Sequence, residues 1–193
     1  METIILKDRF TGSMTDEEFL WFCQENKDLR IERNSKLEII IMSPVTTLSN
    51  YGSGAVFAQL YMWSLQNGNG LAFDSSTGFT LPDRSVLSPD ASWLSKEKWN
   101  ALSDHDKDRF APVCPEFIIE VRSKSDSLED LQAKMKVWIK NGAELAWLID
   151  PREKTTYIYH PKEELRVVKG LDKTMQGSGA VAGFVLDLSL LTI

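Results

Sequence analysis

The sequence is poor in the residues that build disulfide frameworks and zinc sites. It has two cysteines, Cys23 and Cys114, which lie far apart, and two histidines, His105 and His160. No CxxC pair occurs, and the cysteines and histidines do not have the spacing of zinc ligands. Because disulfides belong mainly to oxidising compartments, we expect reduced cysteines and a cytoplasmic protein.

Long apolar runs are missing as well. No segment approaches the roughly 20 consecutive apolar residues that a membrane-spanning helix needs. The amino-terminal stretch METIILKDRF lacks the basic and then apolar order of a secretory signal. These absences predict a soluble protein that does not use a membrane as its partner.

An excess of basic residues is also absent. The chain has 28 acidic and 22 basic residues and a net charge of −6 at pH 7, which argues against a broad surface that coats nucleic acid. A nuclease remains open, because a metal site needs carboxylates and a local basic groove can exist on an acidic protein. The 193 residues, 42% of them hydrophobic, suit a single domain over 1–193 that buries a core without disulfides.

The local patterns predict an α/β protein. Thr15-Asp-Glu-Glu18 reads as a capping box that opens a helix. Residues 29–33 and 37–42 flank a short polar turn and predict a β-hairpin, and residues 49–66 have helical spacing of apolar side chains.

A strand–helix–strand unit follows in residues 116–150. The strand at 116–123 is strongly apolar, a helix begins after Ser127 and ends at Asn141-Gly142, and a second apolar strand ends before Pro151. This order is typical of two parallel strands joined by a crossover helix. The other strands look like hairpins, so we expect a mixed sheet with helices on its faces.

Charged residues in the strand at 116–123 are the first candidates for chemistry. Ile118, Glu120 and Arg122 alternate along the strand and therefore share one face. A strand this apolar should be covered on both faces, and burying a carboxylate costs several kcal/mol unless a cation or donors meet it. Glu120 is therefore either a structural partner of Arg122 or a functional carboxylate.

Three further residues have a bland and a functional interpretation. Asp90 follows Pro89 and marks an ordinary strand entry unless it faces Glu120. Lys134 lies just outside the apolar arc of its helix, so it either covers the edge of the core or reaches the end of the Glu120 strand. Glu32 is on the polar face of the first hairpin and, taken alone, is a solvated strand residue.

Taken together and in order, these segments resemble a known family. The segments are Pro89-Asp90, PEFIIEVRS at 115–123, LQAK at 131–134, Asn141-Gly142 and WLIDP at 147–151. The set resembles the Uma2 family of proposed endonucleases (also called DUF820), a branch of the PD-(D/E)XK nuclease superfamily. The resemblance implies a restriction-endonuclease-like fold and metal-dependent hydrolysis of DNA phosphodiester bonds.

The resemblance also implies roles for individual residues. The carboxylates of Asp90 and Glu120 and the carbonyl of Val121 would hold Mg²⁺, with Mn²⁺ as a substitute. A lysine would orient or deprotonate the attacking water and stabilise developing charge. Glu32 matches the upstream acidic residue of the family.

Two departures keep other hypotheses open. The superfamily lysine normally lies two residues after the glutamate, where this chain has Arg122, which stays protonated; the Uma2-like pattern offers Lys134 instead. Many relatives also carry a histidine where this chain has Ser49. A catalytically silent module that binds nucleic acid or regulates is therefore the second hypothesis, and a structural protein that dimerises through a sheet edge is the third. A homodimer also suits the nuclease hypothesis, because cutting two strands commonly uses two sites.

Overall fold

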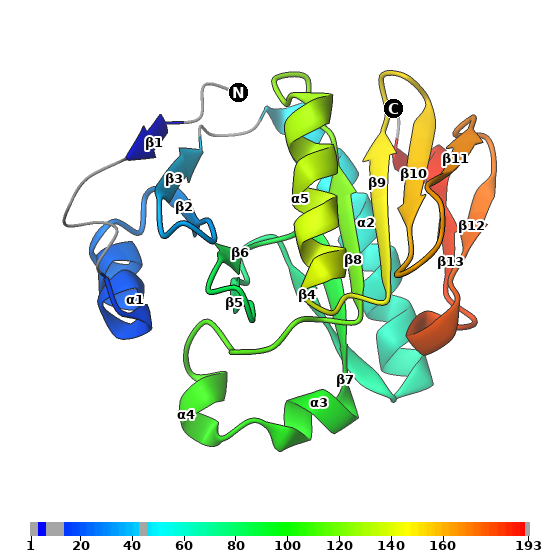
Figure 1. Ribbon diagram of the computed structural model, residues 1–193. Coiled ribbons are helices and arrows are strands. Elements are labelled where there is room, and N and C mark those ends of the chain that lie inside the picture. Colours follow the sequence, from blue (N-terminus) through cyan, green and yellow to red (C-terminus); the bar gives the residue numbers. More distant parts are fainter. Residues whose placement is uncertain (1–3, 7–13, 43–45, 192–193) are drawn as a thin grey trace.

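The computed structural model describes residues 4–6, 14–42 and 46–191 (Figure 1). The elements of its amino-terminal half are β1 (Ile4–Leu6), α1 (Asp16–Glu25), β2 (Arg30–Arg33), β3 (Ile39–Met42), α2 (Thr47–Asn67), β4 (Gly70–Asp74), β5 (Phe79–Thr80), β6 (Val86–Leu87) and β7 (Ala91–Ser95). The remaining elements are α3 (Lys96–Ala101), α4 (Asp104–Lys107), β8 (Phe117–Val121), α5 (Leu128–Lys140), β9 (Leu145–Asp150), β10 (Thr155–Tyr159), β11 (Arg166–Lys169), β12 (Thr174–Gln176), η2 (Gly179–Val181), β13 (Val185–Asp187) and η3 (Leu188–Leu191).

The larger sheet is the centre of the molecule. Its six strands run in the order β11-β10-β9-β8-β7-β4, and β8 pairs with β9 in parallel while the other pairs are antiparallel. Figure 1 shows α5 in front of this sheet and α2 behind it. The predicted strand–helix–strand unit and the mixed sheet with helices on both faces are confirmed.

Alternation along β8 distributes its side chains between two cores. Phe117, Ile119 and Val121 belong to the core on the α2 side. Ile118 belongs to the core on the α5 side, together with Met135 and Trp138 of that helix. Since side chains two residues apart share a face of a strand, Glu120 follows Ile118 to the α5 side.

A second, smaller sheet forms from the amino-terminal segment. Its order is β1-β3-β2-β6-β5, so the predicted hairpin is the middle of a five-stranded sheet. Helix α1 begins at the predicted capping box, in which Glu18 N–H donates to Thr15 Oγ1 and Thr15 N–H donates to the Glu18 carboxylate. The strands β1 and β6 are too short for their sequences to predict them.

Strand β2 has one face toward α1 and one face away from it. Ile31 packs in the core that contains Phe19 of α1. Arg33 is fully buried, pairs with Asp16 and lies over the Phe19 ring at 4.8 Å. Alternation therefore turns Arg30 and Glu32 to the opposite face, away from α1.

None of the helices in the described ranges is long and apolar enough to span a membrane.

Candidate active site

Lys134 of α5 connects the two sheets through glutamates. Its Nζ lies 2.8 Å from Oε1 of Glu120 on β8 and 2.8 Å from Oε1 of Glu32 on β2. It also donates a hydrogen bond to the backbone carbonyl of Ser88 at 3.1 Å. The functional interpretation of Lys134, that it reaches the end of the Glu120 strand, matches this geometry.

Glu32 is not the solvated residue that its strand pattern predicts. It is 4% exposed, and its carboxylate accepts a hydrogen bond from the Ser88 N–H at 2.9 Å in addition to pairing with Lys134. The prediction was wrong because the side chain of Lys134, about a hundred residues later in the chain, reaches this face of the hairpin. Alternation shows that Glu32 is opposite the α1 core, but it does not show what covers that second face.

Asp90 lies beside Glu120 at the entrance to β7. Ala91 pairs with Ile119, so Asp90 comes next to Glu120 in the antiparallel register. Oδ2 of Asp90 accepts the Val121 N–H at 2.8 Å, and the Ser53 hydroxyl of α2 also bonds to this carboxylate. The structure therefore brings Asp90, Glu120 and the backbone of Val121 together.

Charge is unevenly balanced in this group, which we call the carboxylate site: Glu32, Asp90, Glu120 and Lys134. Burial raises the pKa of Glu120 to about 7; the Lys134 ammonium opposes this shift, and the Asp90 and Glu32 carboxylates add to it. Burial also raises the pKa of Asp90, against the opposing effects of the Val121 N–H and the charges of Lys134 and Arg30.

Lys134 responds to the same charges in the opposite sense. Burial alone would lower the pKa of Lys134, but the Glu120 and Glu32 carboxylates outweigh it and raise that pKa above its ordinary value. Lys134 is therefore an ammonium ion at neutral pH, paired with two carboxylates, and its charge also acts on Asp90. The carboxylate site carries excess negative charge when all of its acids are ionised.

The donor atoms fit a hard divalent cation. Over the described part of the chain, no group of three or more His, Cys, Asp or Glu side chains is placed to hold one ion. Mg²⁺, however, usually takes one or two carboxylates and completes its shell with water and substrate phosphate. Asp90 and Glu120 supply that number, and an added cation would offset both the burial that raises the pKa of Glu120 and the charges of the neighbouring carboxylates.

Arg122 has a different partner from the one that strand alternation suggests. It lies just beyond β8, where its Nη1 pairs with Oδ2 of fully buried Asp150 at 2.6 Å and its Nε donates to the Asp126 carbonyl at 3.1 Å. The interpretation of a structural Glu120–Arg122 pair was therefore wrong. The ion pair joins the ends of the parallel strands β8 and β9, and the chain leaves the alternating geometry after Val121.

Some residues at the carboxylate site gave no signal in the sequence. Ser88 contributes its backbone N–H and carbonyl, which any residue could supply, and Ser53 reaches Asp90 from α2. Arg30 shares a strand face with Glu32, and that alternation is the one sign that could have marked it. Ser49 lies in α2, but its side chain is outside the described part of the structure.

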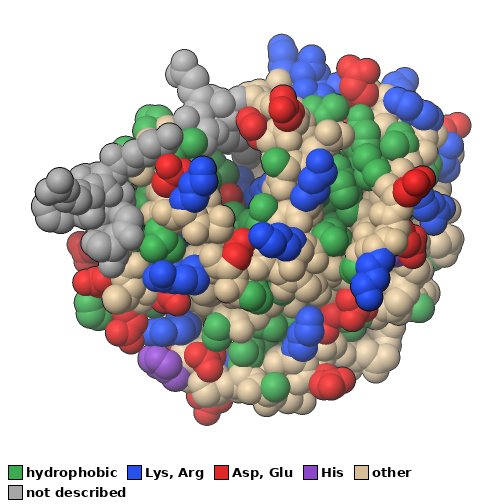
Figure 2. All heavy atoms as spheres, in the orientation of Figure 1, with side chains coloured by type: hydrophobic (Ala, Val, Ile, Leu, Met, Phe, Trp, Pro, Cys, Tyr) green, Lys and Arg blue, Asp and Glu red, His purple; other side chains and the backbone are tan. Residues whose placement is uncertain are grey.

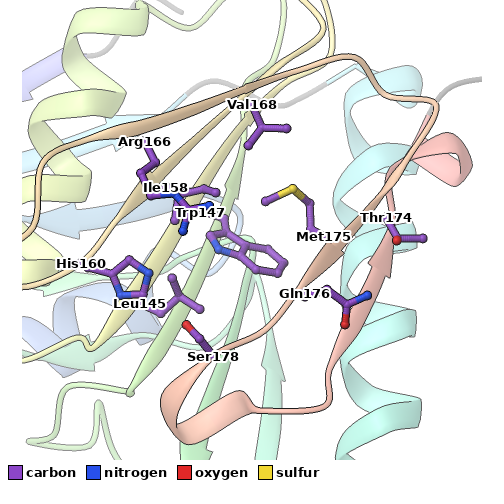
Figure 3. A pocket seen from close by; sticks show the side chains of 10 residues that line it. All are labelled: Leu145, Trp147, Ile158, His160, Arg166, Val168, Thr174, Met175, Gln176 and Ser178. Atoms are coloured by element: carbon purple, nitrogen blue, oxygen red, sulfur yellow. The ribbon is translucent and has the colours of Figure 1, made fainter.

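A pocket of about 300 Å³ lies on the other side of the central sheet (Figure 3). Leu145, Trp147 and Met175 line it, and these residues belong to the core on the α2 side, whereas Glu120 and Lys134 are on the α5 side. His160 and Arg166 are at its rim, and its lining contains no carboxylate. The pocket is therefore separate from the carboxylate site.

Comparisons with known proteins agree with this architecture. Residues 16–189 match the model of the Uma2 family, described as "Putative restriction endonuclease". A crystal structure from Anabaena variabilis ATCC 29413, described as a "putative nuclease belonging to DUF820", aligns with a TM-score of 0.73 at 19% identity and covers 92% of this chain and 97% of its own. This likeness shows a shared nuclease fold and confirms the predicted fold class.

A cryo-EM structure of a DrdV–DNA complex aligns more weakly, with a TM-score of 0.39 at 11% identity, over 63% of this chain and 12% of that one. A comparison with curated protein sequences gives no significant match. Because the family model spans nearly the whole chain, the chain belongs to the Uma2 family.

Proposed function

We propose that this protein is a metal-dependent endonuclease that hydrolyses DNA phosphodiester bonds, with Mg²⁺ as its cofactor and Mn²⁺ as a substitute. The observation that carries the proposal is the carboxylate site, in which Lys134 pairs with Glu32 and Glu120 while the charge of Asp90 acts on Glu120. Uncompensated negative charge away from water is unfavourable. A fold that gathers such charge without a structural need for it is suited to hold a cation.

The side chains of Asp90 and Glu120 and the backbone carbonyl of Val121 are the proposed ligands. When bound, Mg²⁺ polarises a phosphate and lowers the pKa of a coordinated water. The protein holds these ligands in place by its own contacts, since the Val121 N–H and the Ser53 hydroxyl both bond to Asp90. Preorganised ligands of this kind need little rearrangement when the cation binds.

Lys134 is the proposed catalytic cation. Its raised pKa keeps it protonated, so it is suited to stabilise negative charge on the phosphate and to orient the attacking water. It is a poor general base while Glu32 and Glu120 both pair with it. Glu32 is a positioning residue, because it fixes Lys134 and is itself held by the Ser88 N–H.

Arg122 acts in this proposal through the backbone. Its pair with Asp150 fixes the ends of β8 and β9, where Glu120 and Val121 lie. Arg122, which lies two residues after Glu120, thus has a structural role. In this proposal Lys134 acts in place of the superfamily lysine. Because Arg122 has this structural role, its presence gives less reason to expect a catalytically silent module.

DNA contact is proposed to be local. Figure 2 shows basic and acidic side chains intermingled on the face that carries α5. Arg30 is half-buried on β2, and its positive charge acts on Asp90, so a phosphate that approaches the carboxylate site meets both Arg30 and Lys134. A basic contact of this size suits an acidic protein that binds its substrate at one place.

The test is nicking of supercoiled plasmid in Mg²⁺ and in Mn²⁺. We expect cleavage that disappears with a chelator and with Glu120→Ala, while Glu129→Ala, on the exposed first turn of α5, cleaves like the parent. Circular dichroism checks that each variant is folded. Folded parent protein that shifts the mobility of DNA without cutting it would replace the nuclease with the silent binding module.

A further inference from the structure

Helix α2 has an outer face without charge. Residues 39–73 contain no Asp, Glu, Lys or Arg, in a chain of which 26% is charged. The inner face of α2 is satisfied, because Val56 and Leu60 are fully buried in the core. The outer face exposes large apolar side chains, namely Leu48, Tyr51, Tyr61, Met62 and Leu65, which are 43–64% exposed.

The elements beside α2 extend this apolar surface. Both β13 and η3 contact α2, and they expose Val185 and Leu190, at 45% and 50%. We call this surface, with the five side chains of α2 above, the α2 face. Large apolar patches on soluble proteins commonly mark interaction sites.

Gly54 is an exposed residue of α2 at which no packing inside this chain requires a glycine. A methyl group added to it would meet nothing within 4 Å, whereas one added to Gly70 would lie 2.2 Å from the Trp93 ring. A glycine inside a helix destabilises it by about 1 kcal/mol relative to alanine. Gly54 and the exposed Ala58, one turn later, leave a shallow place where a second helix can come close.

We infer that the α2 face is the interface for a second copy of this chain. A two-fold interface brings each patch against itself, so any charge near the axis meets its own copy. The α2 side chains of this surface carry no charge and avoid that repulsion, and the Asp187 carboxylate at the end of β13 is held by the N–H and hydroxyl of Ser189. DNA does not fit this face, because residues 39–73 offer no cation to a phosphate, and the same absence leaves nothing to attract anionic lipid.

The size of the α2 face also suits a dimer. A helix of 21 residues is about 30 Å long. Packed neighbours at spacings of about 10 Å make the strip of α2, β13 and η3 about 20 Å wide. Its projected area of about 600 Å² approaches the roughly 800 Å² per partner of a standard interface. The inference is independent of the proposed function, since it concerns a surface without catalytic groups.

Sedimentation of the full chain, without metal or DNA, tests the inference. We expect a dimer at micromolar concentration and a monomer for Ala58→Glu with Met62→Glu, whose dimer dissociation constant should rise about a hundredfold or more because like charges oppose each other across the axis. The matched control is Leu165→Glu with Val167→Glu, two exposed apolar residues at β11, the edge strand of the central sheet. This control should remain a dimer.

A cross-link confirms the place of contact without relying on a destabilising variant. Ala58→Cys near the proposed axis should form a covalent dimer with a short bis-maleimide, while Ala133→Cys, on the exposed side of α5, should remain monomeric on a denaturing gel. A monomeric parent at about 100 µM, well above a micromolar dissociation constant, would overturn the inference. So would a dimer that only the β11 variant disrupts, or equal cross-linking of the two cysteine variants.

Discussion

Two glutamates flank the same strand, and their surroundings differ. Glu116 and Glu120 lie at opposite ends of β8, and each is 5% exposed. Glu116 accepts hydrogen bonds from the Ser95 hydroxyl and N–H at 2.7 and 3.1 Å, and Lys98 lies 3.5 Å away. Glu120 shares Lys134 with Glu32 and lies close to Asp90.

The difference between the two ends of β8 is the number of negative charges per cation. One carboxylate with dedicated donors fixes the end of β7 and the start of α3 and needs nothing more. Three carboxylates that share the charges of Lys134 and Arg30 leave charge that the protein does not neutralise. Burial of a carboxylate therefore does not identify a functional site by itself, whereas an excess of buried carboxylates points to a missing cation.

Replacing each glutamate by its amide should give the largest contrast. Glu120→Gln should lower plasmid nicking by about a thousandfold or more, on the scale of removing a key group that stabilises a transition state. Glu116→Gln should retain nicking within about threefold per folded molecule and lower the free energy of unfolding by about 1–2 kcal/mol, because it weakens hydrogen bonds to a charged group. Single-turnover rates and urea unfolding measure the two effects.

Equal loss of activity in these two variants would remove the distinction between the two ends of β8. It would mean that both glutamates act through the strand rather than through a cation. A metal titration separates these outcomes, because Glu120→Gln alone should abolish Mg²⁺-induced stabilisation of the folded protein.

The two lysines that pair with these glutamates give the next contrast. Lys134→Met should lower the nicking rate by about a hundredfold, because one preorganised cation near the phosphate is lost. Lys98→Met, beside Glu116, should leave the rate unchanged. Lys134→Met should still bind metal, and Mg²⁺ should raise its unfolding temperature more than that of the parent, since the ion then faces Glu32 and Glu120 without competition. A fully active Lys134→Met protein would remove Lys134 from the mechanism.

Arg122 tests whether the second cation at this end of β8 is structural. Arg122→Gln leaves Asp150 buried without its partner, which should destabilise the protein by about 3 kcal/mol. Chemical denaturation measures this change. Activity per folded molecule at low temperature should fall much less than in Lys134→Met. A rate loss as large as that of Lys134→Met, at unchanged stability, would place Arg122 among the catalytic groups.

Local patterns made Glu120 and Lys134 candidates with two interpretations each, and the resemblance to the Uma2 family then grouped them with Asp90. The alternation in β8 placed Glu120 on a covered face, and the edge of the apolar arc of α5 placed Lys134 within reach of it. The fold class followed from the apolar strands β8 and β9 with a capped helix between them. These features depend on neighbours in the sequence, which a single chain displays.

Contacts between distant segments could not be predicted in the same way. Glu32 looks solvated in its strand, because its cover comes from Lys134, about a hundred residues later. Arg122 looks like a partner of Glu120, because the turn after Val121 that sends it to Asp150 is not visible in a two-residue repeat. Ser88 contributes only backbone atoms, so no side-chain pattern marks it.

Stability against pH gives the smallest and most specific contrast. The pKa of Glu120 is raised from 4.5 to about 7 in the folded protein. Between these values the folded state holds a proton that the unfolded state has released, so the metal-free protein should lose stability as pH rises from about 4.5 to about 7 and gain none of it back above pH 7. Glu120→Gln, which cannot ionise, should show a shallower fall over this window. Urea unfolding in a chelator at half-unit pH steps measures these slopes.

Mg²⁺ at pH 8 should restore the stability of the parent and not that of Glu120→Gln, because the cation takes the place of the proton. Identical slopes for the parent and Glu120→Gln would show that Lys134 already neutralises Glu120. Asp90 alone would then indicate that the site lacks a cation.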